Sequence, residues 1–384
     1  MLGYLVAVPL IALSALGVLG TLLSGVPYVG IATAFVPWYI GWFLVAAVVG
    51  AALAGLVWWR RRGRLAAVLA VVAVLTVTGA SVIVGRMTSA VENAGADIEF
   101  VKLLDLSPSR TVAPDAEVEY SAYDGEPLSL SIFRPRPTSS PAPVLVFVHG
   151  GGWVAGDRSA HSSDLRWFAD QGWLTISVGY PLSSADRHLW DVAQRQIGCA
   201  LTWIAEHAQA YGGDAGRVSI SGDSAGGNLA INSAYLAATG TLPSSCGGRA
   251  PAVAAVSVLY PAVDPAGLWH NEDPVLGGQS RAMVGAYTGG SPEQFPQRYA
   301  QIASATHISP AAPPTLILLP AADHLVPVDA TYRFAEQARE AGVDVALVAV
   351  PYADHVFDAR PGSIGQQAFR QLTAQWLRNH GQAP

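Results

Sequence analysis

Charged residues are scarce in this chain, and its first part has none. They make up 13% of the 384 residues, against about 25% in a typical soluble domain. No Asp, Glu, Lys or Arg occurs between Met1 and Trp59, and Lys102 is the only lysine. The formal net charge is −6, and no basic stripe is visible. Because phosphate contacts need clustered Lys and Arg, we expect no nucleic-acid partner.

Cysteines and metal-binding patterns are also sparse. The chain has 2 cysteines, Cys199 and Cys246, which are too few for a disulfide scaffold or a cysteine-rich metal site. They are compatible with one disulfide in an oxidising compartment or with two buried free thiols, and the sequence leaves both open. No H-E-x-x-H motif and no paired Cys/His spacing occurs. We therefore predict neither a metal ion nor another cofactor.

Hydrophobic residues, by contrast, make up 51% of the chain and gather near its start. The stretches Leu5–Leu23, Trp38–Trp59 and Leu65–Val84 are long and apolar enough to cross a bilayer, which takes roughly 20 residues of helix. The second carries tryptophans at both ends, as expected at two membrane interfaces. Pro27 and Pro37 interrupt the apolar run, which favours a hairpin of two helices over one long span. We predict a transmembrane region of three helices over residues 1–86.

Two alternatives compete with membrane spans, and the charges argue against one of them. A cleaved signal peptide begins with positive charge, whereas Met1–Tyr4 has no charged side chain and two more apolar spans follow. Buried helices of a soluble protein rarely come three in a row. Arg60–Arg62 and Arg64 lie between the second and third spans, and positive loops stay cytoplasmic. The third span then delivers the chain after Arg86 to the far side of a multi-pass membrane protein.

The rest of the chain has the pattern of an α/β domain. Residues 87–116 show no strong hydrophobic period and are predicted to be a linker, and residues 117–384 form the domain. Several predicted strands are continuous apolar runs, and they alternate with helices, which indicates a mostly parallel, doubly wound sheet. Residues 265–309 break this rhythm and are predicted to lie over the sheet. The predicted strands are Leu128–Phe133, Val144–Val148, Leu174–Val178, Val218–Ser221, Ala254–Leu259, Thr315–Leu319 and Val345–Val350, and the helices Asp191–Ala210, Ser224–Ala238, Asp329–Ala341 and Gly365–Asn379.

Two glycine motifs follow predicted strands. Gly222–Gly226 reads G-x-S-x-G between a strand and a helix, a turn that exposes the oxygen of Ser224 at a helix N-terminus. His149–Gly152 reads H-G-G-G after another strand. Consecutive glycines leave backbone N–H groups open to a ligand, and acyl transfer needs such donors where an oxyanion develops. His149 is predicted to brace its loop rather than to take part in catalysis.

An acid and a base follow the last two strands. Asp323 comes after Thr315–Leu319, and His355 after Val345–Val350. The chain order Ser, Asp, His is that of a nucleophile, an orienting acid and a general base in α/β-hydrolases. His355 would take the proton of Ser224 during attack on a carbonyl and pass it to the leaving alcohol, and water would then release the acyl-enzyme. Alternative acids are Asp329, Asp354 and Asp358, and the alternative base is His324.

These motifs also carry a family resemblance. From about Ala116 onward, the chain resembles the carboxylesterase group that includes the hormone-sensitive-lipase-like enzymes, which implies the α/β-hydrolase fold. The resemblance rests on His149–Trp153, Gly222–Gly227, Asp323 and His355. It implies that the N–H groups of Gly151, Gly152 and Ala225 form the oxyanion hole.

Two further positions bear on the branch of the family. Gly156-Asp157 is similar to a branch with polysaccharide-side-chain esterases and arylformamidase-like enzymes. Asp323-His324-Leu325 replaces the usual Asp-Pro-Leu, which weakens any assignment to a subfamily. The three N-terminal spans lie outside the resemblance.

The sequence thus predicts a membrane-anchored serine carboxylesterase, with short-chain or acetyl esters favoured. Its partners would be a small-molecule or lipid ester and the membrane lipids. An amidase or arylformamidase is the enzymatic alternative, because the same triad cleaves amide bonds. A non-catalytic membrane receptor or scaffold is the alternative outside enzymes. Degenerate members usually lose site residues, whereas this chain keeps the nucleophile, the base and the oxyanion glycines.

Overall fold

The structure, a computed structural model, describes residues 2–136 and 140–384. Met1, at the start of the predicted membrane region, and residues 137–139 of the predicted catalytic domain lie outside the described residues. The chain divides into two compact units. The helical unit comprises Met1–Ser109, Pro320–His324 and Ala349–Phe369. The sheet unit comprises Arg110–Leu319, Leu325–Val348 and Arg370–Pro384.

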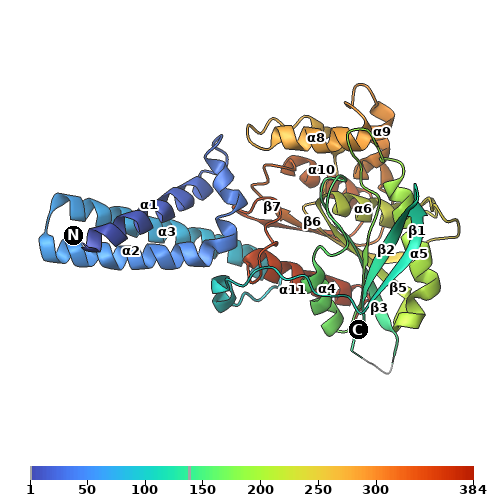
Figure 1. Ribbon diagram of the computed structural model, residues 1–384, viewed down its shortest axis with the longest axis horizontal. Coiled ribbons are helices and arrows are strands. Elements are labelled where there is room, and N and C mark those ends of the chain that lie inside the picture. The colour runs from blue at the N-terminus through green and yellow to red at the C-terminus, as the bar shows by residue number, and fades with distance from the viewer. Residues whose placement is uncertain (1, 137–139) are drawn as a thin grey trace. The chain divides into compact units, whose positions relative to one another are not determined.

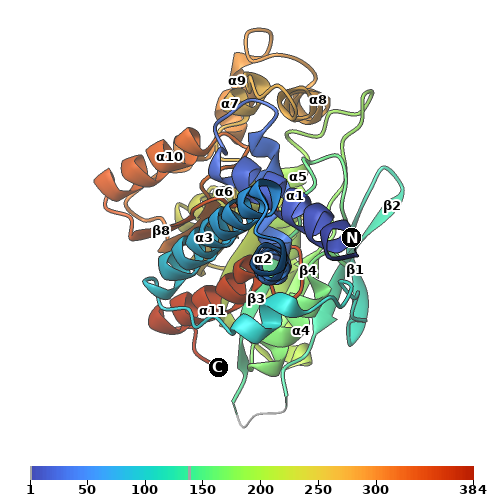
Figure 2. The ribbon, with the colours of Figure 1, turned by 90° about the vertical axis from the view of Figure 1, so that its left-hand side faces the viewer.

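Three helices form the N-terminal part of the helical unit (Figures 1 and 2). They are α1 (Leu2–Leu22), α2 (Ile40–Arg61) and α3 (Arg64–Glu92). Among the described residues, α2 and α3 are long and apolar enough to cross a membrane, and Val6–Leu22 of α1 forms a shorter apolar helix. The three predicted spans therefore correspond to three helices, of which two meet the criterion for a span.

The packing of these helices places small residues inside and large apolar side chains outside. Ala7, Ile11, Ala54 and Ala73 form a buried cluster. A side chain at Gly79 would collide with Val18, which shows how closely α1 and α3 approach. Small interior residues with apolar outward surfaces are typical of helices packed in lipid. The exposed apolar side chains include Leu13, Leu16, Leu65, Val68, Val71, Val74 and Leu75.

The two ends of this helical bundle differ. Arg60, Arg62 and Arg64 lie at the turn between α2 and α3, at the same end as the N-terminus in Figure 1. The opposite end carries residues 23–39, which we call the hairpin loop and which contain the short helices η1 (Gly30–Ala34) and η2 (Pro37–Tyr39). After α3, a third short helix, η3 (Phe100–Leu104), returns to α2, where Trp42 Nε1 donates a hydrogen bond to the Leu104 carbonyl at 3.1 Å.

An eight-stranded sheet organises the rest of the chain, in the order β1-β2-β4-β3-β5-β6-β7-β8. The pairs from β4 through β3, β5 and β6 to β7 are parallel, whereas β2 is antiparallel to both β1 and β4. The predicted, mostly parallel sheet is confirmed, and β3 is buried along its whole length. The strands are β1 (Ala116–Tyr123), β2 (Glu126–Phe133), β3 (Ala142–Val148), β4 (Leu174–Val178), β5 (Gly213–Asp223), β6 (Val253–Leu259), β7 (Thr315–Pro320) and β8 (Val345–Val350).

Helices alternate with these strands as the sequence predicts. Ser224–Ala238 forms α6 with the predicted bounds, and the other predicted helices differ by a few residues at their ends. Within the sheet unit, α4 and the C-terminal part of α11 are joined by an ion pair between Arg370 Nε and Asp164 Oδ1 at 2.7 Å. The helices are α4 (Ser162–Asp170), α5 (Ala193–His207), α6, α10 (Val328–Glu340) and α11 (Ile364–Asn379).

Residues 265–309 contain short helices and no strand. They are α7 (Pro265–Trp269), α8 (Gly277–Thr288), α9 (Pro296–Ile302) and η5 (Ser304–His307). Figure 1 shows α8 and α9 together at one border of the sheet unit. Tyr287 of α8 stacks on Trp153 with ring centroids 4.6 Å apart, so this insertion packs against the loop that follows β3.

Of the two cysteine states that the sequence leaves open, the structure has the disulfide. Cys199 on α5 is bonded to Cys246 in the loop after α6. Their Cα atoms are 5.4 Å apart, within the usual range for a disulfide. The bond ties this loop to α5, and it requires an oxidising compartment to persist.

Candidate active site

The turn at Ser224 is locally strained. Ser224 directly follows β5 and opens α6, and its φ of 51° lies in the left-handed region, which a residue with a side chain rarely adopts. The turn is possible because its flanks are glycines. A Cβ on Gly226 would overlap the carbonyl oxygens of Val148 and His149. Such local strain is found where a side chain must be presented in one orientation.

The glycine loop after β3 is fixed to this turn. The N–H of Gly150 donates a hydrogen bond to Asp223 Oδ1 at 2.7 Å. Gly151 has a φ of 108°, and a Cβ there would overlap the Ala155 carbonyl oxygen, so the conformation requires glycine. Asp223 therefore binds the first N–H of the glycine run and ties this loop to the turn at Ser224.

His149 braces this loop, as predicted. Its ring stacks on Tyr180 with centroids 4.4 Å apart, and the hydroxyl of Tyr180 donates to the His149 carbonyl at 2.9 Å. Burial lowers the pKa of His149, against the raising effects of the Gly150 carbonyl and the Asp223 charge. The ring is thus held between Tyr180 and the Gly150 carbonyl, with Nδ1 2.8 Å from that oxygen.

A polar chain that begins at Asp223, the residue before Ser224, was missed by sequence reasoning. His161 Nε2 lies 4.0 Å from Asp223 Oδ1, and His161 Nδ1 lies 3.1 Å from Asp164 Oδ2. Asp164 in turn pairs with Arg370. Burial acts to raise the pKa of Asp164, but His161 and Arg370 lower it below its ordinary value. The position of Asp223 inside G-x-S-x-G was the one available signal for this chain of contacts.

The predicted acid and base are in contact. Asp323 follows β7 and His355 follows β8, and His355 Nδ1 lies 2.7 Å from Asp323 Oδ2. The side chain of Asp323 has 0% exposed surface and that of His355 has 9%. A carboxylate that accepts the Nδ1 hydrogen fixes the tautomer in which Nε2 can accept a proton. This is the relationship that a general base requires.

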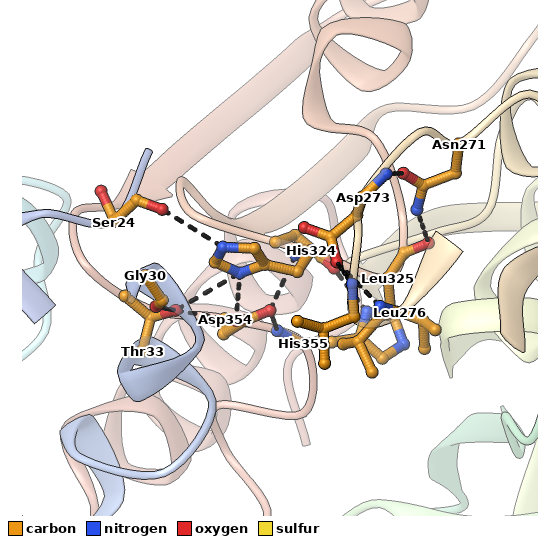
Figure 3. Close-up of polar contacts among 12 residues, drawn as sticks. Ser24, Gly30, Thr33, Asn271, Asp273, Leu276, His324, Leu325, Asp354 and His355 are labelled. Atoms are coloured by element: carbon orange, nitrogen blue, oxygen red, sulfur yellow. Dashed lines mark hydrogen bonds and ion pairs between the residues drawn. The ribbon is translucent and has the colours of Figure 1, made fainter. Parts of the chain in front are cut away.

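A second histidine–aspartate pair lies beside the first, formed by the rival residues. His324 Nδ1 lies 2.5 Å from Asp354 Oδ2, and the N–H groups of His324 and His355 donate to Asp354 Oδ1 at 2.9 and 2.7 Å. Burial acts to raise the pKa of Asp354, but the bonds and charge of His324, together with Thr33, lower it. Asp354 is thus an ionised acceptor for the loop backbones (Figure 3), while His355 Nδ1 is bonded to Asp323.

The predicted site residues are divided between the two compact units of the chain. Ser224, Gly151, Gly152 and Ala225 belong to the sheet unit, whereas Asp323 and His355 belong to the helical unit. Of the alternative acids, Asp329 lies on α10 and Asp358 beyond His355. Among residues 2–136 and 140–384, no group of three His, Cys, Asp or Glu side chains could hold a metal ion.

Comparison with known proteins points to one family. The BD-FAE family model matches residues 130–338, more than half of the chain. Ethyl acetate hydrolase of Pseudomonas putida is 30% identical over 276 residues, which are 66% of this chain and 78% of that protein. LipM of Mycobacterium tuberculosis, named as a probable carboxylic ester hydrolase, is 31% identical over 65% of this chain, but the match spans only 57% of LipM.

Solved structures agree on the fold. Esterase 2 of Thermogutta terrifontis superposes with a TM-score of 0.59 at 23% identity, over 70% of this chain and 95% of that protein. At this identity the likeness shows the fold alone, and that fold is the predicted α/β-hydrolase fold. Together with the family match, it places the chain in the BD-FAE family, among the α/β-hydrolase carboxylesterases.

Proposed function

We propose that this protein is a serine hydrolase that cleaves carboxylic esters, with Ser224 as nucleophile, His355 as general base and Asp323 as the acid that orients His355. The observation that carries the proposal is the 2.7 Å contact between His355 Nδ1 and Asp323 Oδ2. It leaves Nε2 as the ring nitrogen for proton transfer. The left-handed Ser224 at the start of α6 supplies the matching nucleophile.

The reaction follows from these roles. His355 takes the proton of Ser224 as its oxygen attacks the ester carbonyl, and the imidazolium that forms is stabilised by Asp323. The N–H groups of Gly151, Gly152 and Ala225 bind the oxyanion, and each such donor is worth about 3 kcal/mol in the transition state. His355 then protonates the leaving alcohol, which leaves an acyl-enzyme on Ser224. Water, activated by the same base, releases the acid.

A short acyl group is the favoured substrate. The relative from Pseudomonas putida is named for ethyl acetate, an acetyl ester. In this chain, Met283 of α8 packs directly on Gly152, so closely that a Cβ at Gly152 would overlap its sulfur. A bulky side chain against the oxyanion loop leaves little room beside the carbonyl, which supports an acetyl or other short acyl ester over a long-chain lipid ester.

The chain is proposed to be anchored in a membrane. The two span-length helices α2 and α3 support this, and α1 packs beside them as a third predicted span. Arg60, Arg62 and Arg64 mark the cytoplasmic end. In the helical unit, the segments with Asp323 and His355 contact the hairpin loop, at the opposite end. The catalytic domain, proposed as residues 117–384 after the linker 87–116, would then face outward.

The test uses the full-length, detergent-solubilised protein, p-nitrophenyl esters and a fluorophosphonate probe. Ser224→Ala is expected to lower kcat by roughly 10⁴-fold or more and to abolish labelling. Ser233→Ala, further along α6, is the matched control and should keep both activities. If the folded wild-type protein neither reacts with the probe nor hydrolyses esters, the proposal of an enzyme is refuted, and a non-catalytic membrane receptor or scaffold is favoured. Faster cleavage of the matched anilides would favour the amidase.

A further inference from the structure

The hairpin loop, residues 23–39, contacts the segments that carry the proposed acid and base. Trp38 Nε1 donates to the carbonyl of Val356, the residue after His355, at 3.0 Å. His324 Nε2, next to Asp323, lies 3.2 Å from the Ser24 carbonyl. The Arg360 guanidinium lies over the ring of Tyr39, 4.2 Å from its centroid. All these residues belong to the helical unit, so one membrane-side loop borders both functional segments.

Asp354 is the point where these contacts meet (Figure 3). Its Oδ1 accepts the backbone N–H groups of His355 and His324. Its Oδ2 accepts from His324 Nδ1 and from the Thr33 hydroxyl. Asp354 is 1% exposed, and a buried carboxylate persists only when its acceptor sites are filled. Asp354 therefore holds the backbone at His355, the proposed base, and at His324, the residue next to the proposed acid Asp323.

Thr33 is the contribution of the hairpin loop to this carboxylate. Its hydroxyl lies 2.8 Å from Asp354 Oδ2, across 321 residues of sequence, and 2.7 Å from the Gly30 carbonyl. The hydroxyl has one hydrogen and can donate it to only one of these two oxygens, and the charged carboxylate oxygen is the stronger acceptor. Thr33 is 2% exposed. Its position is fixed by the tight turn at Gly30, where a Cβ would overlap the Ser24 carbonyl oxygen.

We propose that Thr33 and Asp354 are positioning residues, through which the loop between the first two helices sets the orientation of His355. The proposal rests on the role of His355 as general base given above. Because Asp354 binds the N–H of His355, a shift of this carboxylate moves the imidazole relative to its reaction partner. Small displacements of a catalytic group cost much more in rate than in binding. The membrane helices would then tune catalysis in addition to anchoring the domain.

The central variant is Thr33→Val, which removes the hydroxyl and keeps the shape. We expect kcat for a soluble p-nitrophenyl ester to fall about tenfold, since the lost bond ends on a charged group, with little change in KM. Thr33→Ser restores the hydroxyl and should recover most of the rate. Thr78→Val is the matched control, because the Thr78 hydroxyl bonds within its own helix, to the Val74 carbonyl at 3.0 Å, and it should behave as wild type.

Rates are normalised to the sites that a fluorophosphonate labels at completion. A merely structural role would reduce the labelled fraction and the melting temperature while leaving kcat per labelled site unchanged, and that result would overturn the proposal. If Thr33→Val does not accumulate as folded protein, Thr33→Ala removes the same hydroxyl with less bulk. Equal kcat per site in wild type and either variant would likewise overturn it.

A double-mutant cycle tests whether Thr33 affects His355 through Asp354. If Thr33 acts through Asp354, adding Thr33→Val to Asp354→Asn should cost less than twofold beyond Asp354→Asn alone. Fully additive losses would show that Thr33 acts elsewhere, against the proposal. Ser224→Ala is included as the reference for the chemistry. If Ser224→Ala loses activity while Thr33→Val behaves as wild type, only the positioning role of Thr33 is refuted. If Ser224→Ala retains activity, the proposed function itself is refuted.

Discussion

The N–H of Gly150 donates a hydrogen bond to Asp223 Oδ1 at 2.7 Å, and this bond joins the glycine loop after β3 to the residue before Ser224. The two motifs that the sequence shows separately are therefore one structural element. The bond fixes the distance between the proposed nucleophile and the N–H groups of Gly151 and Gly152. Preorganised donors are effective because they need no rearrangement during the reaction.

Removal of this acceptor should slow the reaction without large effects on binding. For Asp223→Ala we expect kcat toward p-nitrophenyl acetate to fall roughly tenfold or more, because a misplaced oxyanion donor acts mainly in the transition state. Asp223→Asn keeps an acceptor oxygen for Gly150 and should retain more of the rate. Steady-state kinetics are compared with Asp186→Ala, an exposed loop position. Equal kcat in Asp223→Ala and wild type would contradict the role of this bond.

The contact between Met283 and Gly152 predicts a change in acyl preference. Met283→Ala should open space beside the oxyanion loop and raise kcat/KM for butyrate and hexanoate esters relative to acetate by about tenfold, the value of one or two buried methylene groups. Met283→Leu keeps the volume and should leave the profile unchanged. A p-nitrophenyl ester series provides the measurement. An identical profile in the alanine variant would show that α8 does not limit the acyl group.

The sequence predicted the features that depend on local patterns. Apolar runs predict the strands β3 to β8, and strand-end positions predict the contact between Asp323 and His355. β1 was not predicted, because it begins the sheet at an edge and alternates exposed with half-buried residues, among them Glu117 and Glu119, a pattern typical of a protected edge strand.

The contacts that sequence reasoning missed join residues far apart in the chain. Asp354 was considered only as a rival acid for the triad, whereas the structure gives it four donors, from His324, His355 and Thr33. Thr33 lies among apolar residues between two predicted spans, and no local pattern marks it. Only the packing of the hairpin loop against the segments that follow β7 and β8 reveals its partner.

The ion pair between the buried Asp164 and the partly exposed Arg370 predicts a pH dependence of stability. His161 and Arg370 hold the folded-state pKa of Asp164 below its ordinary value despite burial. The ionised pair therefore stabilises the fold at every pH above about 4, the pKa of an unfolded Asp, and this contribution is lost as pH falls through the lower folded-state value.

Asp164→Asn should thus lower the free energy of unfolding by about 3 kcal/mol near pH 7, because Arg370 loses its charged partner. The deficit should shrink progressively below about pH 4 as the wild-type carboxylate is protonated. Thermal melts of both proteins across this range provide the measurement, with Asp170→Asn as the exposed control on the same helix. A deficit that stays constant from pH 7 to pH 3 would rule out the ionised pair as its source.

The orientation of the chain can be tested with reporters at two points. Arg60, Arg62 and Arg64 lie at one end of the helices, and the hairpin loop at the other. If the arginine turn is cytoplasmic, alkaline phosphatase fused to the C-terminus should be active and a fluorescent protein there dark, with the reverse for fusions after Gly63. A fluorescent C-terminal fusion would show that the C-terminus lies in the cytoplasm, which is the opposite topology. The Cys199–Cys246 bond would then lack the oxidising surroundings that it needs, and thiol alkylation without reductant should detect both cysteines.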